Sequence, residues 1–208
     1  MRRVWKNGDK MQLAGGGTAQ DAAQAISEGL ARAAVAAKVN GELVDLSHVL
    51  REGDAVEIVT LKDKEGLEVY RHTCAHVLAQ ALKTIFPTCK LAIGPVIDNG
   101  YYYDVDFKTP ITMEDFEKIE AEMRKIIKSN LPIRRFTLPR EEAIALMSQY
   151  HEPYKVELIQ DLHEGEEISL HQPGAFPDLR RGPPPPSTGQ LHAFNPVPTP
   201  APYRRGPP

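Results

Sequence analysis

The chain has 208 residues, of which 41% are apolar and 25% are charged, and its formal net charge is −3. This composition is typical of a soluble globular protein with one or two small domains, and the acidic balance provides no general attraction for nucleic acid. No apolar run is long enough to span a membrane and the N-terminus lacks the apolar core of a signal peptide, so we expect a cytoplasmic protein without membrane contacts. Two cysteines, Cys74 and Cys89, are too few for a disulfide framework.

The first segment of the chain predicts two short strands and a helix. A strand precedes Asn7-Gly8-Asp9, whose residue types favour a turn, and a second strand covers residues 11–13. After Gly15-Gly16-Gly17, Thr18 is a suitable N-cap for a helix over residues 19–28, because its hydroxyl can accept a hydrogen bond from a free backbone N–H.

Three further strands are expected in the first third of the chain. Runs over residues 35–40 and 43–45 meet at a tight turn, and the alternating run 55–61 follows. This order of strands and helix fits a β-grasp fold for residues 1–62. The charged segment 62–66 has the polarity and the glycine of a linker, so a domain boundary is expected there.

The histidine pair His72 and His76 is the strongest chemical signal in the chain. A spacing of four residues places both imidazoles on one face of a helix, about one turn apart. Apolar residues follow at helical spacing and would hold this helix against a core: Val77, Leu78, Ala81, Leu82, Ile85 and Phe86. The pair is compatible with two metal ligands, with a site that holds a water and a substrate hydroxyl, or with an ordinary position at the core edge.

Residues 93–106 predict a β-hairpin. Asn99-Gly100 readily accepts the positive φ angles of a tight turn, and β-prone runs flank it on both sides. The aromatic run Tyr101-Tyr102-Tyr103 that follows suits a half-buried strand.

The segment after the hairpin predicts a mixture of helices and strands. Thr112 begins an amphipathic helix, a strand covers residues 133–138, and Pro139 starts a helix over residues 140–149. Residues 154–179 alternate short apolar runs with Gly and Pro, which is consistent with small strands. The arrangement as a whole is α+β.

The C-terminal end is rich in proline, since twelve of the 18 prolines lie in residues 173–208. Proline cannot donate a backbone hydrogen bond, so residues 183–208 are expected to be extended or disordered, and the folded part is expected to end near Leu179. A solvated tail and a ligand for aromatic-lined grooves are both compatible with this composition.

The histidine pair followed by the hairpin resembles the editing domain of threonyl-tRNA synthetases, which alanyl-tRNA synthetases and free-standing relatives share. Residues 38–45 are similar to part of the TGS domain of these synthetases, and residues 154–156 and 178–183 are similar to later editing segments. The resemblance implies three parts: a TGS-like β-grasp domain over residues 1–62, an incomplete editing domain over residues 63–182, and a disordered tail over residues 183–208.

The resemblance also assigns roles in hydrolysis at the acceptor end of a mischarged tRNA, Ser-tRNA(Thr). His72 and His76 would hold the water or the terminal ribose hydroxyls, and Tyr103, Lys155 and Asp178 would position the aminoacyl group. From spacing alone, a surface ion pair accounts for Lys155 and Asp178, and a strand core position accounts for Tyr103. The resemblance implies no cofactor in this chain, and two histidines are fewer than the three or four protein ligands of a zinc site.

Two positions depart from the family pattern Asp-Leu-Cys-Arg-Gly-Pro-His. Arg180 stands in place of the Cys and Pro184 in place of the His, which in the family join the earlier histidines in the editing cleft. We therefore expect an impaired editing site. Burying an unpaired guanidinium is costly, so the loop that carries Arg180 is expected to turn outward.

The class II catalytic core of the family, which binds ATP, threonine and zinc, has no counterpart in this sequence, and neither has the anticodon-binding domain. The sequence therefore predicts an N-terminal fragment of a threonyl-tRNA synthetase that does not itself aminoacylate tRNA. The full-length family is homodimeric, whereas this fragment is expected to be monomeric. Two other interpretations stay open: a free-standing deacylase acting in trans, and a non-catalytic RNA-binding or interaction module.

Overall fold

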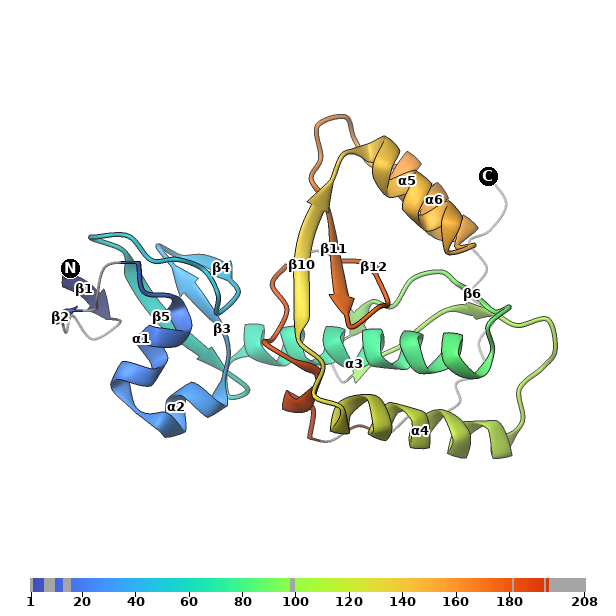
Figure 1. Ribbon diagram of the computed structural model, residues 1–208, viewed down its shortest axis with the longest axis horizontal. Coiled ribbons are helices and arrows are strands. Elements are labelled where there is room, and N and C mark those ends of the chain that lie inside the picture. Colours follow the sequence, from blue (N-terminus) through green and yellow to red (C-terminus); the bar gives the residue numbers. More distant parts are fainter. Residues whose placement is uncertain are drawn as a thin grey trace.

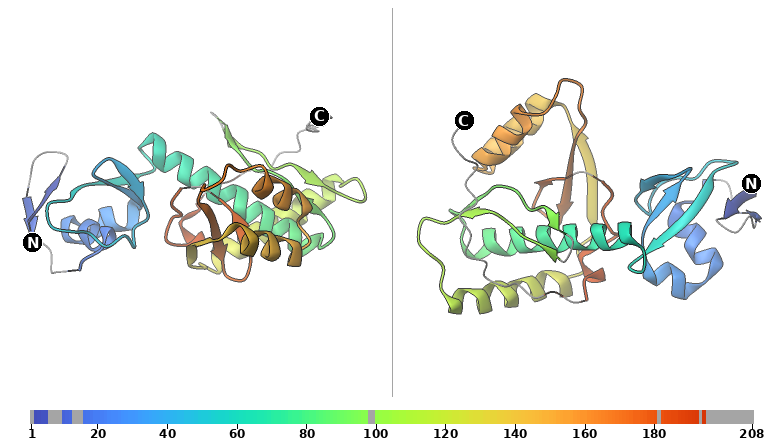
Figure 2. Two further views of the ribbon diagram at one scale, coloured as in Figure 1. Left: turned by 90° about the horizontal axis from the view of Figure 1, so that it is seen from above. Right: turned by 180° about the vertical axis from the view of Figure 1, so that it is seen from behind.

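The computed structural model describes residues 2–5, 10–12, 16–97, 100–180, 182–192 and 194, and its fold is α+β (Figure 1). A five-stranded sheet with two helices forms one end of the molecule, and a long helix leads from it into a second region of helices and small sheets (Figure 2). The α+β class and the β-grasp-like first unit confirm the expectation from the sequence. Within the described residues, no helix is both long and apolar enough to cross a membrane.

The first sheet is mixed and has the strand order β2-β1-β5-β3-β4. Its strands are β1 (Arg2–Trp5), β2 (Lys10–Gln12), β3 (Ala34–Val39), β4 (Glu42–Val44) and β5 (Ala55–Thr60). β1 and β5 are parallel, and the other neighbouring strands are antiparallel. The turn expected at Asn7-Gly8-Asp9 lies outside the described residues.

Two helices, α1 (Ala19–Ile26) and α2 (Glu28–Ala33), replace the single helix expected over residues 19–28. Thr18 caps α1 as expected. Ser27 ends α1 in an extended conformation with φ of −167°, and its Oγ accepts a hydrogen bond from Leu30 N at 3.1 Å, which caps α2. The expectation of one helix was wrong because a serine that can cap the next turn competes with continuation of the helix.

Helix α3 (Lys64–Ile85) begins inside the segment that was expected to be a linker. Gly66 belongs to this helix, where a Cβ atom would lie only 1.9 Å from the Thr60 carbonyl oxygen. Val69 of α3 is 3% exposed and packs in one cluster with Val35 and Val59 of the first sheet. The linker expectation was therefore wrong, because the first sheet and α3 share buried surface.

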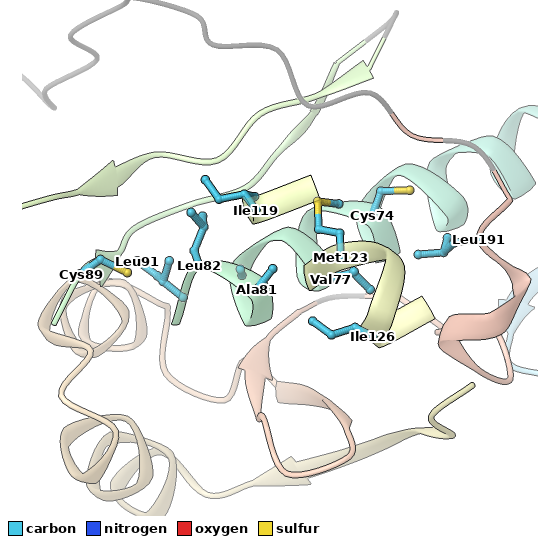
Figure 3. Packing of buried hydrophobic residues seen from close by; sticks show 11 residues of the cluster. Cys74, Val77, Ala81, Leu82, Cys89, Leu91, Ile119, Met123, Ile126 and Leu191 are labelled. Atoms are coloured by element: carbon cyan, nitrogen blue, oxygen red, sulfur yellow. The ribbon is translucent and has the colours of Figure 1, made fainter. Parts of the chain in front are cut away.

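Helix α4 (Met113–Lys128) packs along α3 and forms with it the main core of the second region (Figure 3). Thr112 caps α4 through a capping box with Asp115, as the sequence predicted. The buried side chains of this core come from both helices and from flanking segments: Cys74, Val77, Ala79, Ala81, Leu82, Cys89, Leu91, Ile119, Met123, Ile126 and Leu191.

The predicted hairpin is present as two short strands, β7 (Val96–Ile97) and β8 (Gly100–Tyr101). Gly100 pairs with Ile97 and is therefore a strand residue, while Asn99 lies outside the described residues. A second pair, β6 (Lys90–Leu91) and β9 (Val105–Asp106), extends this antiparallel arrangement.

A three-stranded antiparallel sheet contains β10 (Ile133–Leu138), β11 (Ile168–Pro173) and β12 (Asp178–Leu179). Helices α5 (Arg140–Gln149) and α6 (Pro153–Gln160) pack on it. β10 and α5 confirm the sequence prediction. The small strands expected over residues 154–179 are wrong for the first part of that range, where Pro153 at the first helical position suits the start of α6.

Residues 182–192, which we call the C-terminal strap, pack against the rest of the protein and contain a short 3-10 helix, η1 (Thr188–Gln190). Thr188 is fully buried; its Oγ1 donates to Ile126 O at 3.1 Å and accepts from Leu131 N at 2.9 Å. Gln190 Nε2 donates to Ala34 O of the first unit at 3.2 Å.

The strap corrects the expectation that the folded part ends near Leu179. Its prolines 183–185 are buried, and burying a proline leaves no backbone N–H without a partner. Residues 195–208 of the expected tail lie outside the described residues.

The strap predicts the pattern of limited trypsin digestion. We expect cleavage after the buried Arg180 to be much slower than after the exposed Arg51, because it requires local opening of the strap. Thr188→Ala, which removes both hydrogen bonds of the hydroxyl, should speed cleavage after Arg180 several-fold and leave Arg51 unchanged. Mass spectrometry of the fragments over time measures both rates, and equal rates in the unmodified protein would contradict a packed strap.

Candidate functional site

The alternation of polar and apolar residues in β11 and β12 decides which side chains face α3. Leu170 and Leu179 pair across the two strands and pack into the core with α5 and α6. Their neighbours His171 and Asp178 also pair across the strands, and they therefore share the opposite face of the sheet. A shift of register by one residue would exchange the two sets.

Helix α3 presents Val69, His72, Thr73 and His76 along one stripe, because these residues are three or four positions apart. His76 is 6% exposed, and its ring stacks against the ring of His171 with the centroids 5.8 Å apart. His76 Nδ1 lies 3.2 Å from Asp178 Oδ2, without the geometry of a hydrogen bond. The helix and the sheet thus meet through two imidazoles and a carboxylate.

Lys155 and Tyr103 complete a buried polar group that we call the Asp178 cluster: His76, Tyr103, Lys155 and Asp178. Lys155 Nζ donates to Asp178 Oδ1 and, at 2.7 Å, to Tyr103 Oη. The Tyr103 hydroxyl donates to Asp178 Oδ2 at 3.0 Å. Asp178 is 2% exposed and Lys155 is 4% exposed, so their charges interact away from water.

The loop after the hairpin fixes Tyr103 in this cluster. The ring of Tyr103 lies so close to Gly94 that a Cβ atom at Gly94 would be 2.5 Å from the ring. Burial, followed by the charge of Asp178, raises the pKa of Tyr103 well above its ordinary value. The phenol therefore stays neutral and keeps the proton that it donates to Asp178.

His72 is the one predicted site residue with no described contact to the cluster, and it lies one turn before His76 at a partly exposed position. Burial, followed by the charge of Arg180, lowers the pKa of His72 to about 4. Burial also lowers the pKa of His76 well below its ordinary value, with smaller contributions from Arg180 and Lys155. Both imidazoles are therefore neutral at pH 7, and each has one nitrogen lone pair that can accept a proton.

His171 is a site residue that the sequence interpretation missed. It is 1% exposed, and its Nε2 donates to Gly182 O at 2.9 Å. Because a carbonyl oxygen can only accept, Nε2 carries the proton and Nδ1 has the lone pair. The available signal was the alternation in Ile168-Ser169-Leu170-His171, which places the histidine opposite the two apolar side chains.

Arg180 points into the molecule, contrary to the expectation that its loop turns outward. It is 8% exposed and donates to Thr73 Oγ1 and to Val69 O, each at 3.2 Å. Burial lowers its pKa to about 9, against an opposing effect of Asp178, so the guanidinium stays charged at pH 7. The expectation was wrong because α3 supplies oxygen acceptors for the two terminal nitrogens of the guanidinium.

Pro184 is also buried, but it lies away from the Asp178 cluster. It borders a cavity of about 890 Å³, together with Asp45 and Ser47 of the first unit and Arg134 of β10. The described lining of this cavity contains none of the five predicted site residues. The Asp178 cluster is therefore separate from this cavity.

The described part of the chain contains no group of three or more His, Cys, Asp or Glu side chains that could hold a metal ion such as zinc. We expect the purified protein to contain no stoichiometric zinc, since His72 and His76 alone supply two of the three or four ligands that zinc sites use. Elemental analysis measures the content. About one zinc per chain that disappears in His72→Ala, but not in the exposed control His48→Ala, would overturn this expectation.

Residues 1–60 match the family model of the TGS domain. The chain is 50% identical over 201 residues to the threonine--tRNA ligase of Acetivibrio thermocellus, in an alignment that covers 97% of this chain and 32% of that relative. It is 52% identical over 188 residues to the threonine--tRNA ligase of Clostridioides difficile, with 90% of this chain and 29% of that relative covered. The chain is homologous to the N-terminal region of threonine--tRNA ligases.

The homology to threonine--tRNA ligases confirms the family predicted from the histidine pair and the hairpin. The chain spans about a third of the length of these relatives, as the 32% coverage shows. An alignment over 97% of the chain necessarily includes β3, β4, β5, α3 and the Asp178 cluster. These elements therefore belong to a part of the ligases that is common to the relatives and this chain.

Proposed function

We propose that this region removes serine from mischarged tRNA(Thr) by hydrolysing the ester that joins serine to the terminal ribose. The observation that carries the proposal is the buried Asp178 cluster, formed in a chain that is homologous to threonine--tRNA ligases. Charging of tRNA with threonine is then the activity of the longer ligase, whose class II core uses ATP and zinc. The proposed partner of this region is the acceptor end of tRNA(Thr) in the cytoplasm, and the region acts as a monomer without a cofactor.

The need for such a site follows from the small difference between the two amino acids. Serine lacks one methyl group of threonine, and a difference of this size provides only about 1–3 kcal/mol of discrimination in a binding pocket. A synthetic site alone therefore charges tRNA(Thr) with serine at an appreciable rate. A second site that hydrolyses the wrong product removes the error.

The hydrolysis needs a proton acceptor and a positioned ester. The oxygen of a water molecule forms a bond to the ester carbonyl carbon and loses a proton, while the carbonyl oxygen becomes an oxyanion. The bond from this carbon to the ribose oxygen then breaks, the ribose oxygen takes up the proton taken from the water, and the new carboxylic acid of serine loses its remaining proton to solvent. His72 and His76 are neutral and can accept the proton of the water, and Lys155, which Asp178 and Tyr103 hold in place, positions the aminoacyl group.

We propose that the two regions of the fold are the TGS domain and the editing domain. Residues 1–62 form the TGS domain and the chain from residue 63 onward forms the editing domain, which includes the strap up to residue 192. The two are not independent units, since Val69 of α3 packs against Val35 and Val59 of the first sheet. The TGS domain therefore supports the helix that carries both histidines.

The test is release of serine from Ser-tRNA(Thr) by the purified chain, with Thr-tRNA(Thr) as the specificity control. Arg180 does not open the site to solvent, so we expect hydrolysis at least about 100-fold above the uncatalysed rate despite the departures at Arg180 and Pro184. His72→Ala should abolish most of it, and the exposed control His48→Ala should not. Full activity of His72→Ala would contradict the role of the pair, and tRNA binding without any hydrolysis would identify a non-catalytic module.

The pH dependence of the reaction gives an independent check of His72. Its pKa of about 4 means that the imidazole is the free base over the whole neutral range and becomes protonated only as the pH falls through about 4. We therefore expect kcat to be constant between about pH 5.5 and 7.5 and to decrease only at lower pH. Single-turnover rates in buffers of constant ionic strength measure this, and a decrease centred near 6.5 would show that the imidazole is not buried beside a cation.

A further inference from the structure

Arg180 lies against the stripe of helix α3 that carries His72 and His76. Its guanidinium bonds to Val69 and Thr73, which lie on the same stripe of α3 as His72 and His76. After burial, its charge is the largest influence on the pKa values of His72, His76 and His171. The cation therefore lies next to the side chains that are proposed to handle the water and the ester.

The charges around Arg180 do not balance. Asp178 is the one carboxylate in the described part of the chain that acts on Arg180, and it already binds Lys155 and Tyr103. The buried carboxylate of Glu152, which acts on Tyr103, is paired with Lys83 at 2.6 Å. With neutral imidazoles, two buried cations thus share one carboxylate, and an uncompensated buried positive charge favours binding of an anion.

One donor of Arg180 is also free. Its two terminal nitrogens bond to α3, whereas Nε, which is inaccessible to solvent, has no partner among the described residues. Leaving such a donor unsatisfied costs about 1–3 kcal/mol. A ligand oxygen that carries negative charge is the acceptor that suits this donor best, and it reaches Nε only when the atoms that cover Nε move aside.

We propose that Arg180 binds the oxyanion that develops on the ester carbonyl oxygen, and so supplies electrostatic stabilisation where the family pattern has a thiol. The inference rests on the proposed hydrolysis and adds a catalytic residue to it. A fixed positive charge near a developing oxyanion is effective because it is already oriented before the reaction begins. Arg180 in place of the family's Cys then changes the chemistry of the site without abolishing that chemistry.

Binding of two stable analogues tests this without any turnover. In the first analogue, a phosphonate ester to the 3′ oxygen of adenosine replaces the ester carbonyl of the seryl group and mimics the anionic intermediate. In the second analogue, serine is joined to the 3′ position of adenosine by an amide, whose carbonyl group is uncharged. We expect calorimetry to show at least about tenfold tighter binding of the anionic analogue to the unmodified chain. Arg180→Gln should lose this preference, and Arg134→Gln, which changes an exposed arginine of β10, should retain it. Thermal unfolding confirms that both variants are folded.

The outcomes separate this inference from the proposed function. Equal affinity of the unmodified chain for both analogues overturns the role of Arg180 even if Ser-tRNA(Thr) is hydrolysed, and this result needs no variant. A preference that depends on Arg180 supports the role even if Ser-tRNA(Thr) is not hydrolysed. Where hydrolysis is observed, Arg180→Cys should lower kcat at least about tenfold with little change in KM, and an increase would show that the guanidinium only obstructs the site.

Discussion

Replacing Asp178 by asparagine should destabilise the protein by about 3–5 kcal/mol, because it leaves the Lys155 ammonium buried without a counter-charge. The asparagine has nearly the same shape, so the loss reports the charge and not a cavity. Tyr103 also loses the carboxylate that accepts the hydrogen bond of its hydroxyl group. Urea unfolding followed by circular dichroism measures the free energy of unfolding.

An exposed ion pair provides the matched control. Glu120 binds Arg124 on the surface of α4, where the two side chains are 37% and 64% exposed. Glu120→Gln should cost no more than about 1 kcal/mol, because water screens this pair. The double substitution Lys155→Met and Asp178→Leu should recover part of the stability, since it removes the buried ion pair but leaves Arg180 without a carboxylate. If Asp178→Asn costs no more than Glu120→Gln, the buried pair does not exist in solution.

Gly66→Ala should destabilise the protein by about 2–4 kcal/mol, which is unusual for the addition of one methyl group on a helix. The new Cβ would lie 1.9 Å from the Thr60 carbonyl oxygen and 2.7 Å from its carbon. Both are backbone atoms, so no side-chain rotation can relieve the contact. The start of α3 must move, and with it the packing of Val69 against the first sheet.

Gly29 is the control for Gly66, because it is also a helical glycine but has space around it. The nearest atom to a Cβ at Gly29 would be Ser27 Oγ at 3.9 Å. Gly29→Ala in α2 should therefore stabilise the protein by about 0.5–1 kcal/mol, through the lower backbone entropy of alanine in the unfolded chain. Chemical unfolding measures the free energy of unfolding of both variants. Similar changes of the same sign would show that Gly66 of α3 does not pack against Thr60 of β5.

Regular periodicity explains which elements the sequence predicted well. The strands β3 and β5, the amphipathic helix α4 and the pair β10 and α5 have repeats long enough to identify their type. Helix α6 was mistaken for strand because Pro153–Gln160 is a short run in which strand and helix patterns are alike. Gly66 suggested a linker since the sequence does not show that a carbonyl oxygen lies against it.

The candidate site depends on contacts between distant parts of the chain, which local patterns cannot reveal. The bond from Tyr103 to Asp178 spans 75 residues, and the bond from Arg180 to Thr73 spans 107. The family resemblance named four residues that the fold does bring together, His76, Tyr103, Lys155 and Asp178. It could not place Arg180, because the family has a different side chain there and the outcome depends on which oxygen atoms α3 offers.

The strap has a consequence for the order in which the protein folds during translation. Its hydrogen bonds reach back to Ala34 in the first unit, to Tyr70 in α3 and to Ile126 in α4. The N-terminal part of a chain leaves the ribosome first, so the five-stranded sheet can form early. The contacts of the strap with Tyr70 of α3 and Ile126 of α4 then form last, and a nascent chain paused before residue 182 would leave these surfaces uncovered and open to chaperones.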